Sequence, residues 1–321
     1  MKVSVDVGYG FTKAVSERGV ISFPSVISPA VNFAADEFGK MFDYKVKIRN
    51  CSLNVEKFVG EAAEQSQGAA RFSTREKPAE LHDILLLTAV YLCTEGEKLS
   101  LAVGLPLAYY KAQKEDLKSR LKVLATWVSV NNGPERHIRF EDVSVFPQGV
   151  GAVAALDDLP DKGLVGLIDI GTYTTDYFLL NIRNRLPYPV PEACSSIEGG
   201  VQLIMNALAQ EYHRQTGSPL PGRMQQTVLE KTRQGETVTF WNRQINLTKA
   251  YKLAIKDAVE AISSQVQSAF GDRLSMLDRT YLIGGGSILM FEELKERYPN
   301  VEMLPDPVFA NARGYLKLIG Q

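Results

Sequence analysis

Two stretches of the same pattern constrain the fold of this chain more than any other feature of its sequence. They read DVGYGFTK and DIGTYTTD, one at the start of the 321 residues and one just past the middle. They align without a gap, so that Asp6 matches Asp169 and Gly8 matches Gly171. Each lies between two apolar runs of strand-like composition. A strand–turn–strand unit that occurs twice predicts two similar domains, each opening on a β-hairpin.

A single turn of this type also has an ordinary structural explanation. An Asp side chain often bonds its own backbone in a turn, and Gly supplies a positive φ. The same residue types can hold a polyphosphate, because Gly lets backbone N–H groups approach phosphate oxygens, while Thr and Lys add hydroxyl donors and a positive charge. The repeat favours this second interpretation, with two turns facing a central cleft. Carboxylates beside phosphate need a metal between them, so Asp6 and Asp169 predict Mg²⁺ held largely through its waters.

A third glycine cluster, LIGGGSIL, lies near the end of the sequence. It places three glycines, Gly284 to Gly286, between an apolar strand and an amphipathic helix. This arrangement lets the backbone approach a nucleotide and directs a helix N-terminus toward anions. A plain tight turn between strand and helix would use the same glycines. The spacing differs from G-x-G-x-x-G, which disfavours a nicotinamide-binding Rossmann domain.

The remaining sequence interleaves strand and helix patterns, which predicts an α/β fold with a mixed sheet flanked by helices in each half. The polar segment 157–163 contains Pro and Gly and is the best candidate boundary. We therefore expect a first domain over 1–160 that is completed by 308–321, and a second domain over 161–307.

Each expected domain carries one expected insertion. The first covers about 32–68, where the sequence is polar and irregular, and the second covers about 208–250. The second includes ETVTFWNRQINL, which reads as a hairpin at the domain edge that exposes Phe240 and Trp241. A contact with another copy of the chain and ordinary core packing both remain open for these two aromatic residues.

Composition excludes several classes of function. Lys and Arg total 36 against 37 for Asp and Glu, so the chain as a whole is not predicted to bind nucleic acid. Cys51, Cys93 and Cys194 lack the spacing of a zinc site or a redox pair, and we expect them to be reduced, buried thiols. No apolar run reaches the roughly 20 residues needed to cross a bilayer. We expect a cytoplasmic protein without a membrane partner.

Five motifs, in their order along the chain, resemble those of the actin, heat-shock chaperone and sugar-kinase ATPase superfamily. They are DVGYGFTK, VFPQGVGAVAAL, DIGTYTTD, LIGGGSIL and FANARGYLKLIG. The resemblance covers nearly the whole chain and implies an actin-like ATPase fold, with two similar domains around a nucleotide cleft. Within that superfamily, FVGEAA, VGLPL and NARGYLKLIG are most similar to the bacterial actin-like proteins of the ParM/StbA type, which segregate plasmids.

The resemblance implies a chemical role for four side chains. Asp6 and Asp169 match the carboxylates that orient the Mg²⁺ waters and the attacking water. Gln148 falls near the γ-phosphate, where an amide positions water but is a poor base, so hydrolysis is expected to be slow. Capping of the helix that starts at Gly149 is the alternative for Gln148. Asp176 joins Gln148 and Asp169 as a catalytic candidate, although its position varies in the superfamily and its acid–base role stays open.

The nucleotide-binding residues implied by the resemblance form four groups along the chain. They are Asp6, Gly8, Tyr9, Gly10, Phe11, Thr12 and Lys13 in the first phosphate loop; Gly171, Thr172, Tyr173 and Thr174 in the second; Gly199 and Gly200 beside the ribose; and Gly284, Gly285, Gly286 and Ser287 beside the adenosine. The expected ligands are ATP or GTP and Mg²⁺.

The function implied by the resemblance is an ATP-dependent filament. The protein is expected to polymerise with itself and to move or segregate plasmid DNA through a DNA-binding adaptor, while slow hydrolysis controls filament turnover. A non-polymerising ATPase scaffold or a small-molecule kinase of the same superfamily is the alternative. Such kinases need a further carboxylate to accept the substrate hydroxyl proton, and no clear candidate occurs in the sequence.

Overall fold

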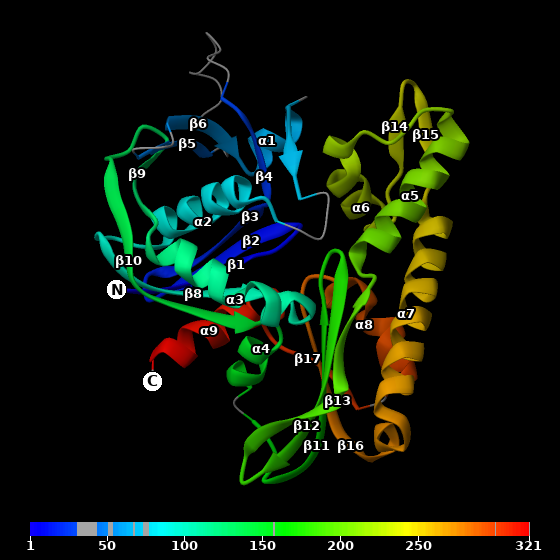
Figure 1. Cartoon of the computed structure of the whole chain (residues 1–321). Helices are drawn as coiled ribbons and strands as arrows, with labels where there is room; N and C mark the ends of the chain where they lie inside the picture. The colour runs from blue at the N-terminus through cyan, green and yellow to red at the C-terminus, as the bar shows by residue number, and fades with distance from the viewer. Residues whose placement is uncertain are drawn as a thin grey trace. The chain divides into compact units, whose positions relative to one another are not determined.

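The polypeptide divides into two compact units (Figure 1). The computed structural model describes residues 1–30, 44–50, 54–66, 68–72, 77–156, 158–298 and 300–320. Unit 1 comprises Met1–Asp157 and Phe309–Gln321, and unit 2 comprises Asp158–Val308. The functional domains expected from the sequence, with limits at 160 and 307, remain a proposal.

Unit 1 is built on one mixed sheet, in which ten strands of the described residues follow the order β3-β2-β1-β8-β10-β9-β5-β6-β4-β7. Strand β1 pairs antiparallel with β2 and parallel with β8, and β8 pairs parallel with β10. The strands are β1 (Lys2–Val7), β2 (Phe11–Ser16), β3 (Gly19–Pro24), β4 (Val26–Pro29), β5 (Tyr44–Arg49), β6 (Asn54–Val59), β7 (Ala70–Arg71), β8 (Lys98–Leu105), β9 (Ala125–Val130) and β10 (Arg136–Pro147).

The segment over about 32–68, expected to be a small insertion of irregular sequence, forms strands where the structure describes it, and its status as an insertion remains a prediction. Strands β5 and β6 pair with each other and join the sheet between β9 and β4. In β5, Val46 and Ile48 are 1% exposed, while Lys47 and Arg49 point outward. Buried and exposed residues therefore alternate in β5 with the period of a strand, although the composition of the segment is polar. The rest of that segment, which includes Cys51, lies outside the described residues.

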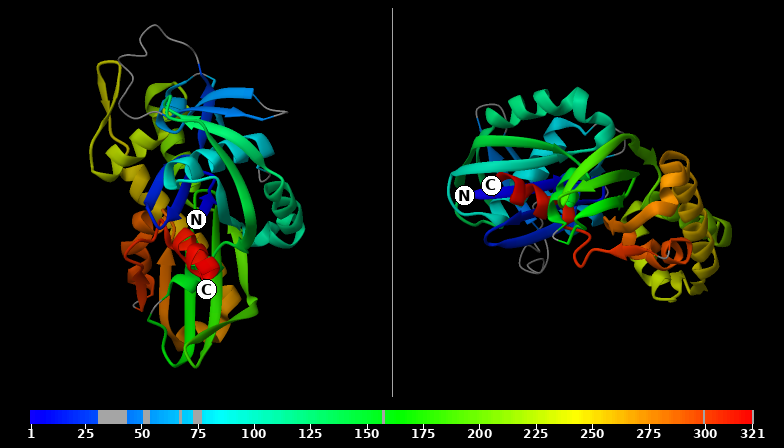
Figure 2. Two further views of the ribbon diagram at one scale, coloured as in Figure 1. Left: turned by 90° about the vertical axis from the view of Figure 1, so that its left-hand side faces the viewer. Right: turned by 90° about the horizontal axis from the view of Figure 1, so that it is seen from below.

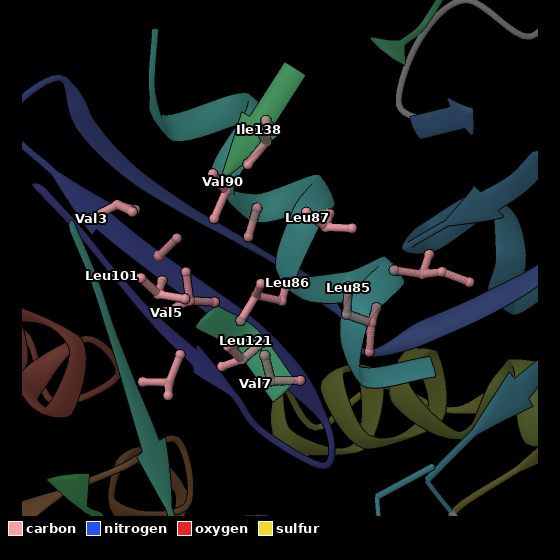
Figure 3. Packing of buried hydrophobic residues seen from close by; sticks show 14 of the residues in the cluster. Val3, Val5, Val7, Leu85, Leu86, Leu87, Val90, Leu101, Leu121 and Ile138 are labelled. Carbon is pink, nitrogen blue, oxygen red and sulfur yellow. The ribbon is translucent and has the colours of Figure 1, made fainter. Parts of the chain in front are cut away.

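Helices cover both faces of the unit 1 sheet. They are α1 (Glu61–Gln65), α2 (Ala79–Cys93), α3 (Leu107–Lys122), α4 (Val150–Ala155) and α9 (Ala310–Gly320). Successive side chains of a strand alternate between faces. Val3, Val5 and Val7 of β1 enter the core beneath α2 (Figure 3), whereas the Ser4 hydroxyl donates to the Ala312 carbonyl of α9 at 2.6 Å. Strand β1 is therefore buried on both sides.

The two ends of the chain meet on unit 1. In both views of Figure 2 the N- and C-termini lie close together, and Lys2 Nζ donates to the Gly320 carbonyl at 3.4 Å. Helix α9 thus returns to the unit in which the chain began. Cys93 is buried, and its burial raises the thiol pKa to about 11, whereas Cys194 of unit 2 is only partly buried.

Unit 2 has a five-stranded sheet of order β13-β12-β11-β16-β17 among its described residues, and a separate hairpin, β14–β15. The strands are β11 (Lys162–Ile170), β12 (Thr174–Arg183), β13 (Leu186–Glu198), β14 (Val238–Phe240), β15 (Arg243–Ile245), β16 (Leu277–Ile283) and β17 (Val301–Met303). The helices are α5 (Val201–Thr216), η1 (Gly222–Met224), α6 (Gln225–Arg233), α7 (Thr248–Phe270), η2 (Gly271–Met276) and α8 (Ser287–Arg297). Ile168 and Ile170 of β11 bury against residues of α5, α7 and α8.

The two sheets repeat one topology. The order β13-β12-β11-β16-β17 corresponds to β3-β2-β1-β8-β10, because each begins with three antiparallel strands and continues with parallel ones. The hairpins β1–β2 and β11–β12 share one register, with Asp6 opposite Lys13 and Asp169 opposite Asp176. The two hairpins predicted from the sequence repeat are therefore confirmed.

Strands β9 and β10 form a hairpin whose turn contains two left-handed residues, Asn131 (φ 53°) and Asn132 (φ 57°). Asn tolerates this conformation better than most residues. In the described part of the chain, no helix combines the length and the apolar character that a membrane crossing requires.

Candidate functional site

The turn between β1 and β2 is narrow and depends on glycine. The Gly8 amide donates to the Phe11 carbonyl at 3.1 Å, which closes the turn. A Cβ on Gly8 would lie 2.6 Å from that same oxygen, so a larger residue cannot occupy this position without moving the backbone. Ser25 supports the turn from β3–β4, since its hydroxyl donates to the Gly8 carbonyl at 2.7 Å and its amide to the Gly10 carbonyl at 2.9 Å.

Asp6 stands directly before this turn and has two polar partners in unit 1. Its carboxylate is buried, lies 3.7 Å from the Lys13 ammonium and accepts a hydrogen bond from Gln148 Nε2 at 2.9 Å. Three residues that the sequence nominated separately therefore form one cluster. A carboxylate, an ammonium and an amide together can orient water and balance phosphate charge.

Gln148 does not cap the helix that follows it. The Oδ1 atom of Asn311, from α9, accepts hydrogen bonds from the Gly149 amide at 2.9 Å and the Ala152 amide at 3.3 Å. These are amides at the start of α4 that a capping side chain would satisfy. The capping alternative for Gln148 is therefore wrong, because a residue more than 160 positions away supplies the cap.

Thr12 and Thr175 play a different part from the one expected of hydroxyls in phosphate loops. Thr12 is fully buried, and its hydroxyl bonds that of Ser25 at 2.9 Å. Its counterpart Thr175 is also fully buried and donates to the Gly199 carbonyl at 2.7 Å. Both hydroxyls hold neighbouring loops in place, so the structure gives Thr12 a supporting position and not an exposed one.

The turn between β11 and β12 repeats the geometry of the first. The Gly171 amide donates to the Thr174 carbonyl at 2.9 Å, the positional equivalent of the bond between Gly8 and Phe11. Thr172 and Thr174 are partly exposed, and the Tyr173 side chain is 37% exposed. The two turns therefore present backbone and side-chain groups in the same way.

The start of α5 is joined to this second turn by backbone hydrogen bonds. The Gly199 amide donates to the Tyr173 carbonyl at 2.8 Å, and the Val201 amide donates to the Gly171 carbonyl at 3.1 Å. A Cβ on Gly200 would lie 2.3 Å from the Gly171 oxygen, so only glycine allows this approach. The predicted ribose turn and the second phosphate loop thus form one rigid unit.

The glycine cluster after β16 adjoins the same strand end. Gly284 has φ +82°, and a Cβ there would lie 2.4 Å from the Ile170 carbonyl oxygen and 2.5 Å from Asp169 Oδ1. The Gly286 amide donates to the Ile170 carbonyl at 2.9 Å. Ser287 is fully buried and its hydroxyl donates to the Gly284 carbonyl at 2.6 Å, whereas Gly285 is exposed. The predicted unit 2 residues therefore converge on the carboxyl ends of β11 and β16.

The two hairpins differ in the residue that lies opposite the repeated Asp, which is Asp6 in the first and Asp169 in the second. In unit 1 it is Lys13, whereas in unit 2 it is Asp176, so Asp169 and Asp176 share one face of adjacent strands. Both are nearly buried, at 8% and 3% exposure. Like charges placed directly opposite are unfavourable in a sheet. A nearby cation would therefore stabilise the unit 2 pair more than the unit 1 pair.

Sequence reasoning missed Lys77. Its ammonium donates to the Val7 carbonyl at the base of the first turn and lies over the Tyr9 ring, 4.7 Å from its centroid, and the Phe72 ring, at 5.5 Å. Burial lowers the pKa of Lys77 to about 8, against the opposing influence of Asp6. The lysine also lines a pocket with Tyr9, His82 and Tyr109. Lys77 therefore stabilises the first turn through its hydrogen bond to Val7.

One sequence signal could have identified Lys77. It lies just before Pro78, at the N-terminus of the core helix α2, where the helix dipole disfavours a positive charge. A lysine at such a position requires compensating partners, and the carbonyl and two rings provide them.

We expect Lys77→Met to stabilise the protein at neutral pH. Burial lowers the pKa of Lys77 in the folded protein to about 8, from the ordinary value of 10.5. Below pH 8 the buried charge therefore lowers the free energy of unfolding by up to about 3 kcal/mol. This cost disappears as the pH rises toward 10.5, because the folded protein loses the proton first. The lost bond to Val7 offsets about 1 kcal/mol. Urea unfolding should show the variant about 1 to 2 kcal/mol more stable at pH 7, with a smaller difference at pH 10. A Lys77→Arg control keeps the charge and should not gain stability; a pH-independent difference would refute the assignment.

The duplicated hairpin, the shared strand order and the return of α9 to unit 1 define the actin-like class of two-domain α/β proteins. Residues 4–151 match the family described as actin-like proteins, N-terminal domain, and residues 167–296 match the archaeal actin homologue MreB-like, C-terminal family. The chain belongs to the actin-like proteins. The fold expected from the sequence motifs is thereby confirmed.

Solved structures place the chain near one branch of this family. A structure described as a pCBH ParM non-polymerisable quadruple mutant is 27% identical, with a TM-score of 0.89, over 100% of this chain and 99% of that one. A 15-stranded ParM filament from Clostridium botulinum is 26% identical, with a TM-score of 0.89, over 99% and 98%. The resemblance to ParM-type proteins is therefore confirmed.

A third structure shows the fold at greater distance. Ta0583, an archaeal actin homologue solved in complex with ADP, is 22% identical, with a TM-score of 0.80, over 99% of both chains. A search of curated protein sequences finds no match to this chain.

Proposed function

We propose that this protein is an ATP-driven, filament-forming actin-like ATPase. The observation that carries the proposal is the pair of glycine turns, each closed by the same hydrogen bond, Gly8 to Phe11 and Gly171 to Thr174, at the same place in two repeated sheets. Such turns present successive N–H groups to phosphate oxygens. The 27% identity to a ParM chain over the full length supports the same conclusion.

In this proposal the two turns bind the phosphates of ATP. Lys13 adds charge beside the first turn, and the partly exposed Thr172 and Thr174 add donors beside the second. The Gly199–Gly200 turn contacts the ribose, and the loop from Gly284 to Gly286 contacts the adenosine. Glycine keeps these turns narrow, because a Cβ at Gly8, Gly200 or Gly284 would meet the chain's own backbone oxygens. The adenosine loop fits a nucleotide at Gly285, which is exposed and has no atom within 4 Å of an added Cβ. The ADP complex of the archaeal homologue Ta0583 supports nucleotide binding by this fold. The sequence leaves ATP and GTP open as the nucleotide, and the proposal takes ATP.

Mg²⁺ fits the carboxylates that the chain offers. Among the residues that the structure describes, no three or more His, Cys, Asp or Glu side chains form a cluster that could surround a metal ion. Asp6 and Asp169 instead supply single hard oxygen donors beside the two turns, which suits an ion that keeps most of its water. When bound, Mg²⁺ would neutralise phosphate charge.

Hydrolysis in this proposal depends on positioned water. The Gln148 amide is held by Asp6 at 2.9 Å and can orient water, but an amide is a poor general base. Asp169 orients the attacking water, and Asp176 stands beside it on the adjacent strand. ATP hydrolysis should therefore be slow, so that a filament can form before hydrolysis weakens it.

Assembly with copies of the same chain is the proposed outcome of ATP binding. The ParM filament from Clostridium botulinum supports this part of the proposal. By the same resemblance, the filament would move or segregate plasmid DNA through a DNA-binding adaptor. Hydrolysis would then weaken the filament and limit its lifetime.

The test is assembly of the purified chain with ATP and Mg²⁺, followed by light scattering, pelleting and negative-stain microscopy. We expect filaments with ATP and none without nucleotide. GTP serves as a parallel arm. Nucleotide hydrolysis without any assembly over a wide range of protein concentration would favour the non-polymerising ATPase scaffold, and phosphate transfer to a small molecule would favour a kinase.

A matched pair of glycine variants tests the nucleotide site itself. Gly285 is exposed with no atom within 4 Å of an added Cβ, so Gly285→Ala should not change thermal stability. If the loop contacts adenosine, the added methyl group should weaken ATP binding about tenfold. Gly222→Ala, at an equally open position outside the loops, should leave binding unchanged. Equal affinities for the two variants would remove this loop from the proposed site.

A further inference from the structure

The pocket beside the first turn of unit 1 has a volume of about 190 Å³. Its wall is formed by residues of α2 and α3 and by the end of β8, with Tyr9 of the turn at one side. Leu85 of α2 and Leu121 of α3 belong to the same buried core cluster (Figure 3). Core packing therefore holds the two helices that form most of the wall.

Much of the lining is apolar or aromatic. Leu105 and Pro106 at the end of β8 and Leu117 of α3 are buried, and the rings of Tyr9 and Tyr109 complete this part of the wall. An apolar cavity of about 150 Å³ can hold a benzene molecule. The pocket therefore has room for one six-membered ring with a small substituent.

Lys77 brings a positive charge to this wall. Its partners among the described residues are neutral: the Val7 carbonyl, to which the ammonium donates, and the Tyr9 and Phe72 rings, whose centroids lie 4.7 and 5.5 Å away. Burial outweighs the influence of Asp6 and lowers the pKa of Lys77 to about 8, so the charge is still present at pH 7. An anion in the pocket would compensate this charge.

The other titratable groups of the pocket leave the charge of Lys77 uncompensated at short range. Arg120 already donates to the Asp83 carboxylate. His82 is 5% exposed, and burial lowers its pKa, so the imidazole is neutral at pH 7. Asp116 is exposed on α3, where water and salt screen its charge. A ligand with a single negative charge would therefore complement the pocket.

We propose that this pocket binds a small carboxylate that carries one six-membered ring, and that the bound ligand weakens the binding of nucleotide at the first turn. The carboxylate would pair with the Lys77 ammonium and compete with the Val7 carbonyl for its protons, while the ring packs against Tyr9 and Tyr109. Lys77 supports the first turn through Val7, and Tyr9 belongs to both the pocket and the turn. The two binding events are therefore linked. The pocket itself does not depend on the proposed function, whereas its effect on nucleotide rests on that function.

Benzoate and benzamide test the preference for charge, because the two molecules have nearly the same shape. In an NMR titration of the nucleotide-free protein at pH 7 and constant ionic strength, benzoate should bind saturably and about tenfold more tightly than benzamide. Acetate and inorganic phosphate are anions without a ring and should bind about tenfold more weakly than benzoate. Equal affinities for benzoate and benzamide, or for benzoate and phosphate, would overturn the proposal.

The three histidines of the chain locate the bound ligand. His82 lines the pocket, whereas His137 lies against Trp127 on β9 and His213 lies in α5 of unit 2. The imidazole resonances are assigned with single His→Gln variants. That of His82 should move saturably with benzoate while the other two stay unchanged. A saturable shift of His137 or His213 without one of His82 would place the ligand elsewhere and overturn the proposal.

Lys77→Met is the decisive variant, because it removes the charge and is expected to remain folded. It should bind benzoate about tenfold more weakly than the unchanged protein does, with no change in the affinity for benzamide. The matched control is Lys111→Met, which changes an exposed lysine of α3 outside the pocket lining and should keep the preference for benzoate. A preference for benzoate that survives in Lys77→Met would refute the assigned role of Lys77.

The effect on nucleotide is measured separately. Saturating benzoate should weaken ATP binding about fivefold in the unchanged protein and leave it unchanged in Lys77→Met, and ATP should weaken benzoate binding by the same factor. If benzoate binds and the affinity for ATP does not change, the link between the pocket and the first turn is refuted. If the protein binds benzoate but no nucleotide, the proposed function is refuted and the carboxylate pocket stands.

Discussion

Replacing Gly314 with alanine is expected to cost about 4 kcal/mol or more of stability in unit 1. Gly314 lies in α9, where a Cβ would be 1.6 Å from the Gly151 carbonyl oxygen and 2.3 Å from its carbon. These are backbone atoms of α4 and cannot rotate away as a side chain can. Overpacking ordinarily costs 1 to 3 kcal/mol, and here two helices must separate.

The neighbours of this crossing leave no room for adjustment. Tyr315 is fully buried and stacks on Phe146, with ring centroids 5.6 Å apart. A Cβ on Gly151 would lie 2.5 Å from the same tyrosine ring and 2.5 Å from the Asn311 carbonyl oxygen. Since Asn311 also caps α4, separating the helices would remove the cap next to Gln148. The variant should therefore lose nucleotide binding together with stability.

Gly320→Ala is the matched control, because it lies at the end of the same helix with no atom within 4 Å of an added Cβ. It should change the free energy of unfolding by no more than about 1 kcal/mol, in the stabilising direction. Urea unfolding of both variants, followed by far-UV circular dichroism, measures the difference. If Gly314→Ala unfolds within 1 kcal/mol of the unchanged protein, α4 and α9 do not cross as closely as the structure shows.

The parts of the fold that sequence reasoning reached are those with local signals. The hairpins around Asp6 and Asp169 are marked by apolar runs on both sides of a glycine turn, and in the structure both the register and the closing hydrogen bond repeat. Strand β5 was missed because two buried residues among lysines and arginine leave the local composition polar. In a strand of six residues, the alternation of buried and exposed positions is a weak sequence signal when the exposed positions carry charges.

The features that sequence reasoning could not reach depend on contacts between distant residues. The cap of α4 by Asn311, the support of the first turn by Lys77 and the burial of the Thr12 hydroxyl against Ser25 each join separate elements. A local sequence pattern shows which residue types are present, but it does not show which distant residue each of them contacts. Thr12 shows the consequence: a hydroxyl beside a glycine turn is equally suited to bind phosphate and to hold the loop behind it.

Replacing Asp169 with asparagine is expected to slow phosphate release at least 100-fold, which corresponds to about 2.7 kcal/mol of transition-state free energy. In the proposed function this carboxylate orients the attacking water, and removal of such a group ordinarily costs a factor of 10² to 10⁴. Asparagine has nearly the same shape, so the close approach of Gly284 to this side chain is kept. ATP binding and assembly should persist while turnover stops, and filaments should outlast those of the unchanged protein.

The matched control is Asp278→Asn, because Asp278 is a carboxylate of the same unit on β16 whose Oδ2 accepts a hydrogen bond from the Leu164 amide at 3.1 Å, outside the glycine loops. It should hydrolyse ATP at the unchanged rate. Phosphate release is followed with filament lifetime in the same sample, so that loss of binding, which abolishes both, is distinguished from loss of chemistry, which prolongs the filament. Normal phosphate release by Asp169→Asn would exclude the proposed role of Asp169 and leave Gln148, held on Asp6 of unit 1, as the group that orients water.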